Sequence, residues 1–102
     1  MDQLKQVEQI LLQHYGKKNS ISSREIASIL GISEDDTFAQ TRAIIFAAAK
    51  QFKLPLAADN AGYYLITEES ELFEYIGNLD NRIFGIKERK EIIIQNFKEW
   101  KK

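Results

Sequence analysis

The side chains best suited to chemistry lie on a stretch of helical spacing in the middle of the chain, residues 37–53. Opposite its apolar stripe stand Gln40 and Lys50, with Arg42 and Lys53 at one margin of that face. Glutamine and arginine match the hydrogen-bonding edges of adenine and guanine, and lysine meets phosphates. This combination indicates binding of duplex DNA. The residues predicted to contact DNA are Arg24, Thr37, Gln40, Arg42, Lys50, Lys53 and Asn60.

The same helical face also supports two other interpretations. Ala39, Ala43 and Ala47 occupy positions where a DNA-reading helix usually carries polar side chains, and Phe46 lies beside them. Such a stripe is typical of helix-favouring surface filler, or of a contact with another protein. The acidic run at 34–36 would also repel phosphate, which a helix N-terminus normally attracts. A protein-interaction module with a host or viral partner, and without DNA contact, is therefore the alternative prediction.

Few groups are available for catalysis or metal binding. The chain has no cysteine and a single histidine, His14, which lies on an apolar helical stripe and is expected to be a packing residue. Glu34, Asp35 and Asp36 are expected to cap the following helix and not to hold a cation. We therefore predict no enzymatic activity, no cofactor and no metal site. Fourteen lysines and arginines against fifteen acids give a net charge of −1, so DNA contact requires a local basic patch.

The elements before residue 53 read as three helices. Residues 3–15 have the spacing of an amphipathic helix, which Gly16 ends. A second helix begins at Ser22 or Ser23, and Gly31 supplies the tight turn that follows it. Its predicted buried residues are Ile26, Ile29 and Leu30, with the small Ala27 allowing a close helix crossing. The predicted buried residues of the third helix are Phe38, Thr41, Ile44, Ile45, Ala48 and Phe52.

Beyond residue 53 the pattern changes to two short strands and then to one long helix. Pro55 disfavours helical geometry, and residues 56–58 and 63–66 read as strands joined by a turn at 59–62. From Ser70 almost to its end the chain has helical spacing, with an apolar seam in steps of four and three that predicts a homodimer. The predicted dimer interface consists of Leu72, Ile76, Leu79, Ile83, Ile86, Ile93, Phe97 and Trp100, and Lys90 is the polar member of the seam.

The predicted fold class is mainly α with a small β-hairpin (α+β), in the element order of a winged helix-turn-helix with a long C-terminal helix. ISSREIASILGIS at 21–33, LPLAADNAGYYLI at 54–66 and ELFEYIGNLDNRIFGIKER at 71–89 resemble small winged helix-turn-helix proteins of phages and prophages. This resemblance implies binding of duplex DNA through the helix at 37–53 and the wing at 56–66, in transcription regulation or as an accessory to DNA metabolism. One departure is an acidic insertion of about one helical turn after Gly31.

We divide the sequence into a winged helix-turn-helix domain, residues 1–66, and a C-terminal helix, residues 67–102, that packs on the domain and dimerises. A dimer is expected to place two DNA-binding units for paired half-sites. The N-terminus lacks the basic and apolar regions of a signal peptide, and the longest apolar run is too short to span a bilayer. A cytoplasmic location without membrane contact is therefore expected.

Overall fold

The computed structural model describes residues 2–35 and 37–100. Over these ranges the chain is mainly helical, with four α-helices and one two-stranded antiparallel sheet, which confirms the predicted α+β class. It divides into two compact units, Met1–Glu71 and Leu72–Lys102. The elements are α1 (Gln3–Leu11), the short 3₁₀ helix η1 (Lys17–Asn19), α2 (Ser23–Leu30), α3 (Ala39–Phe52), β1 (Leu56–Asp59), β2 (Gly62–Leu65) and α4 (Glu69–Trp100).

Helix α1 begins at an aspartate cap and ends sooner than predicted. The Asp2 side chain accepts hydrogen bonds from two N–H groups of the first turn, which the helix itself leaves open. The helix stops at Leu11, and not at residue 15, because the backbone that follows pairs with β2. The carbonyl of His14 accepts a hydrogen bond from Leu65 N–H (2.8 Å), and Gly16 N–H donates to the carbonyl of Leu65 (2.8 Å).

Both ends of α2 are capped as the sequence indicates. Ser22 Oγ accepts from the N–H of Glu25 (3.1 Å), and Glu25 Oε1 accepts from the N–H of Ser22 (3.2 Å), a reciprocal capping box. At the other end Gly31 adopts the left-handed conformation, with φ of +74°. These local signals therefore fix where α2 begins and ends.

The buried side of α2 differs from the prediction in one residue. Ile26 and Ala27 are buried and Leu30 is partly buried, but Ile29 is 62% exposed. Successive helical residues are rotated by about 100°, so Ile29 points roughly 110° away from the midpoint between Ile26 and Ala27. The predicted burial of Ile29 is therefore wrong.

Helix α3 begins at Ala39, later than the predicted start at Thr37. Phe38 has a left-handed backbone, with φ of +51°, which separates the helix from the residues before it. The predicted core positions Phe38, Ile44 and Phe52 are only partly buried, because the first precedes the helix, the second flanks its apolar stripe and the third ends it. The buried residues of α3 are Thr41, Ile45, Ala48 and Ala49.

The hairpin pairs with a third extended segment that the sequence analysis did not identify. β1 and β2 are antiparallel, with Leu56 opposite Leu65. Ile21, just before α2, forms a bridge with Tyr63, in which the N–H of each residue donates to the carbonyl of the other at 2.8 and 2.7 Å. A Cβ atom on Gly62 would lie 2.3 Å from the carbonyl oxygen of Ile21, so this approach requires glycine.

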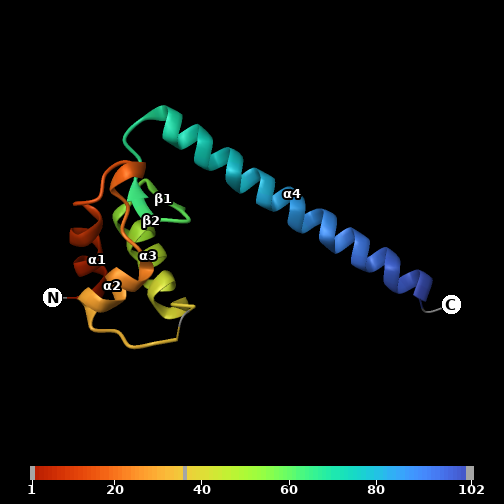
Figure 1. Ribbon diagram of the computed structural model, residues 1–102, viewed down its shortest axis with the longest axis horizontal. Coiled ribbons are helices and arrows are strands. Elements are labelled where there is room, and N and C mark those ends of the chain that lie inside the picture. Colours follow the sequence, from red (N-terminus) through yellow and green to blue (C-terminus); the bar gives the residue numbers. More distant parts are fainter. Residues whose placement is uncertain (1, 36, 101–102) are drawn as a thin grey trace. The chain divides into compact units, whose positions relative to one another are not determined.

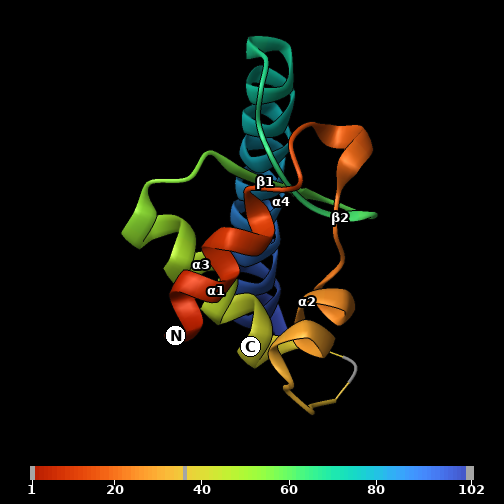
Figure 2. The ribbon, with the colours of Figure 1, turned by 90° about the vertical axis from the view of Figure 1, so that its left-hand side faces the viewer.

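One hydrophobic core holds the first unit together. Figures 1 and 2 show α1, α2 and α3 gathered against the hairpin. The buried side chains come from all of these elements and from Ile21, so the core connects helices and sheet into one body. They are Val7, Leu11, Ile21, Ile26, Ile45, Ala48 and Leu65.

Helix α4 is one uninterrupted helix of 32 residues that continues through Gly77 and Gly85. Glu69 and Glu71 in its first turn and Lys98 in its last turn match the sign of the helix dipole at each end. The structure describes α4 throughout, and none of its side chains is buried. No helix within residues 2–35 and 37–100 is both long enough and apolar enough to cross a membrane.

Candidate nucleic-acid interface

The outward face of α3 carries the polar residues that the sequence analysis selected. Gln40, Arg42 and Lys50 are all exposed, while the opposite face of the helix is buried in the core. Between them lie the exposed Ala43 and Ala47. Successive helical residues are rotated by about 100°, so Gln40 and Lys50 lie on this face and Arg42 lies at its margin. Side chains of this face can reach into a groove of DNA.

The N-terminus of α3 is closed by a carboxylate from the preceding loop. Glu34 Oε1 accepts from the N–H of Gln40 (2.9 Å), and its Oε2 accepts from the N–H of Thr41 (2.9 Å) and from the Thr41 hydroxyl. Asp35 Oδ1 accepts from the N–H (3.0 Å) and the hydroxyl (2.6 Å) of Thr37. The donors that would bind a phosphate at this helix end are thus already engaged by the protein itself.

These hydrogen bonds favour the charged form of both acids. The hydroxyl of Thr41, opposed in part by desolvation and aided by the backbone N–H groups of Gln40 and Thr41, lowers the pKa of Glu34 below its ordinary value. The hydroxyl and N–H of Thr37 lower the pKa of Asp35 in the same way. The predicted capping role thus matches the contacts of Glu34 and Asp35, whereas Asp36 lies outside the described residues.

Two of the predicted DNA-contacting residues are tied to this helix start. Thr37 is exposed, but its side chain is held by Asp35. Arg24 projects from α2, and its guanidinium lies 5.1 Å from the centre of the Phe38 ring, a cation–π contact. The structure therefore brings a positive charge from α2 to Phe38, the residue that precedes α3.

The C-terminal end of α3 is basic. Lys50 lies in its last turn, and Lys53 caps the helix in a left-handed conformation, with φ of +56°. The N–H of Lys53 donates to the carbonyl of Ala49, and both lysine side chains are exposed. A phosphate close to α3 is therefore better matched at this end than at the N-terminal end.

The turn of the hairpin is closed by its own aspartate. Asp59 Oδ1 accepts from the N–H of Ala61 (2.9 Å) and of Gly62 (3.2 Å). Asn60, the predicted contact at the tip, is exposed. The aspartate is thus part of the turn geometry, and Asn60 is the side chain that the turn offers to a partner.

The predicted dimer residues all lie on α4. Seven of the eight are exposed, up to 84% for Trp100, and Leu79 is partly buried.

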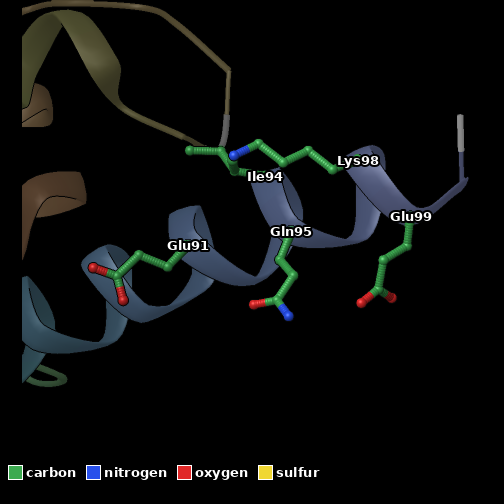
Figure 3. Close-up of a pocket in the computed structure, with 5 residues that line it drawn as sticks. All are labelled: Glu91, Ile94, Gln95, Lys98 and Glu99. Atoms are coloured by element: carbon green, nitrogen blue, oxygen red, sulfur yellow. The ribbon is translucent and has the colours of Figure 1, made fainter.

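Figure 3 shows the last turns of α4, where Glu91, Ile94, Gln95, Lys98 and Glu99 border a hollow on the surface. Because all five belong to one helix, they form a surface strip that mixes apolar and charged groups and not an enclosed ligand site.

The structure places Gln40, Arg42 and Lys50 on α3, with Lys53 at its end, whereas Asn60 lies in the turn between β1 and β2. The contact of Glu34 with Thr41 is not predictable from local spacing, because the two residues are seven positions apart. Within the described residues, no group of three or more histidine, cysteine, aspartate or glutamate side chains could hold a metal ion.

A comparison of the chain with known protein families, curated proteins and solved structures finds no match.

Proposed function

We propose that this chain is a small winged helix-turn-helix protein of the phage or prophage type, which binds duplex DNA through α3 and the β1–β2 wing. Its role is regulatory or accessory to DNA metabolism. It acts as a homodimer joined through the apolar seam of α4. The observation that carries the proposal is the bridge between Ile21 and Tyr63.

That bridge supports the element order expected of a winged helix domain. Ile21, an extended residue between the first two helices, pairs with the hairpin that follows the third helix. In such an arrangement the third helix enters the major groove and the wing meets the backbone or the minor groove. The exposed amide and guanidinium of Gln40 and Arg42 suit that position.

The charges around α3 set the character of the binding. Glu34 and Asp35 occupy one end of the helix, and Lys50 and Lys53 the other. With a net charge of −1 the chain has little long-range attraction for DNA. We therefore expect weak binding by one unit, strengthened when a dimer makes two sets of contacts.

A residue-resolved NMR titration with a mixed-sequence duplex at low salt tests the proposal. Backbone amide shifts are expected at Gln40, Arg42, Lys50 and Asn60. The variant Lys50→Gln should weaken binding and lower the slope of log affinity against log salt by about one unit, because one phosphate contact is lost. Lys98→Gln, with the same change of charge on another element, serves as the matched control and should leave binding unchanged. An unshifted α3 and wing would refute the DNA function.

A second candidate function rests on a different observation. Phe46 on α3 is 68% exposed and lies beside Ala43 and Ala47. An apolar ring next to small residues is typical of a surface that contacts another protein. A protein-interaction module would bind its partner with little response to salt, whereas DNA affinity falls steeply as salt rises.

A further inference from the structure

The apolar seam of α4 is long, and it is exposed on a helix that buries none of its own side chains. Ile83 and Ile86, in the middle of the seam, are each 63% exposed. Spacing in alternate steps of four and three is the pattern at which two helices interlock along their length. The seam covers α4 from Leu72 to Trp100, so it matches a helix of equal length.

The charges on α4 are distributed unequally between its halves. Residues 69–84 hold four carboxylates and one arginine, whereas residues 85–100 hold four lysines and arginines and three glutamates. A second copy running in the same direction would place acidic half beside acidic half. A second copy running in the opposite direction places each acidic half beside a half with a cationic excess.

We propose that α4 pairs with α4 of a second copy of this chain in the antiparallel direction, over the full length of residues 69–100. This inference rests on the proposed homodimer and adds its orientation. In the antiparallel register that overlaps residues 69–100 of both helices, Ile83 faces the partner's Ile86, and Ile76 faces the partner's Ile93. Leu72 and Phe97 face each other near the two ends, so the apolar layers continue throughout the overlap.

The residues that flank the seam favour the same arrangement. In an antiparallel pair with this register, Asp80 lies opposite the partner's Lys87, and the symmetry of the dimer repeats that pair. Lys90, the polar member of the seam, packs against the partner's Leu79 with its ammonium near the partner's Asp80. One kind of like-charged contact, Arg82 with the partner's Arg89, also occurs twice in the dimer, at the solvent-exposed rim, where salt screens it.

The parallel arrangement puts like charges in less favourable places. It sets Lys90 against the partner's Lys90 inside the apolar seam, where two ammonium groups have no carboxylate between them. It also sets Arg82 beside the partner's Lys87 at the rim, twice in the dimer. The polar residue in the seam therefore selects against parallel pairing.

The orientation has a consequence for DNA binding. A helix of 32 residues is about 48 Å long, and each DNA-binding unit is joined to the first turn of its own α4. Antiparallel pairing thus sets the two attachment points about 48 Å apart, at opposite ends of the helix pair. This separation of the attachment points exceeds one turn of duplex DNA, which is about 34 Å.

Because the chain contains no cysteine, disulfide trapping tests the orientation cleanly. The double variant Asp80→Cys with Lys87→Cys places each new thiol opposite the other thiol of an antiparallel partner. Within one chain the two positions are about 10 Å apart along the helix, too far for a disulfide. The variant Leu72→Cys is the matched control, since its two thiols meet only in a parallel pair.

Mild oxidation with a glutathione buffer, read on a non-reducing gel, should convert most of the double variant to covalent dimer. Asp80→Cys alone, Lys87→Cys alone and Leu72→Cys should remain single chains. Absence of covalent dimer from the double variant overturns the proposal, and so does covalent dimer from Leu72→Cys. The gel needs no DNA, so failure of the orientation and failure of the DNA function are read independently.

Discussion

Replacing Gly62 with alanine tests the bridge on which the proposed function rests. The new Cβ would lie 2.3 Å from the carbonyl oxygen of Ile21, and it would sit on a backbone with φ of +141°. The wing and Ile21 must then separate, with loss of the two hydrogen bonds between Ile21 and Tyr63. At about 1 kcal/mol for each hydrogen bond and about 1–3 kcal/mol for the strained backbone, the expected loss is about 3–5 kcal/mol.

Gly31→Ala is the matched control for this variant. Gly31 also has a positive φ, of +74°, but a Cβ there meets no atom within 4 Å. Only the left-handed backbone is penalised, by about 1–2 kcal/mol. Urea unfolding, followed by near-ultraviolet circular dichroism of the tyrosines, measures both variants in the same way. Equal losses for Gly62→Ala and Gly31→Ala would refute the close approach of Ile21 and with it the third extended segment.

Four further outcomes follow from the described contacts. The stability that Glu34 contributes is present above its ordinary pKa of 4.5 and is lost as the pH falls through its lower folded pKa. The urea midpoint of the Glu34→Gln variant should therefore decline less between neutral and acid pH than that of the parent chain. Glu71 Oε2 accepts from the N–H of Lys17 (2.8 Å), so Glu71→Ala, which removes the acceptor, should speed hydrogen exchange of that amide, and an unchanged rate would contradict the contact. Ile86→Asp should reduce the mass by light scattering to one chain while the amide spectrum of residues 2–71 is retained; a persisting dimer would place the interface elsewhere. Gly85→Ala, in the open interior of α4, should stabilise the helix by about 1 kcal/mol, measured as a higher melting temperature in far-ultraviolet circular dichroism.

The sequence predicted the elements whose signals are local. Ser22, Glu25 and Gly31 mark the ends of α2 through residues only a few positions apart, and the structure has these caps. The turn at residues 59–62 and the long C-terminal helix were also predicted, because turn chemistry and helical spacing are readable within a short window. The fold class could therefore be derived without the structure.

Features that depend on distant residues could not be predicted in this way. The early end of α1 results from the pairing of His14 and Gly16 with Leu65, about fifty residues further along the chain. The carboxylate of Glu34, in a segment predicted to cap the next helix, binds the hydroxyl and the N–H of Thr41, seven positions further along the chain. Of the candidate site, the polar face of α3 was readable from spacing, whereas the closure of its N-terminus was not.

The closed end of α3 and the proposed antiparallel dimer together determine which DNA should bind best. Each unit lacks a phosphate site at the N-terminus of α3, because Glu34 holds the N–H groups of Gln40 and Thr41, so one unit alone should bind weakly. In the proposed dimer the attachment points, about 48 Å apart, exceed one turn of duplex, about 34 Å, so we expect a duplex of one turn to engage one unit at a time. A duplex of about three turns reaches both units and gains the second binding event at high effective concentration.

We expect the affinity of the three-turn duplex, measured by fluorescence anisotropy at low salt, to exceed that of the one-turn duplex by at least about tenfold. The difference should vanish in the monomeric Ile86→Asp variant. Equal affinity for both duplexes in the parent chain would mean that the two units do not act together, and the helix pair would then serve a purpose other than joining two DNA contacts.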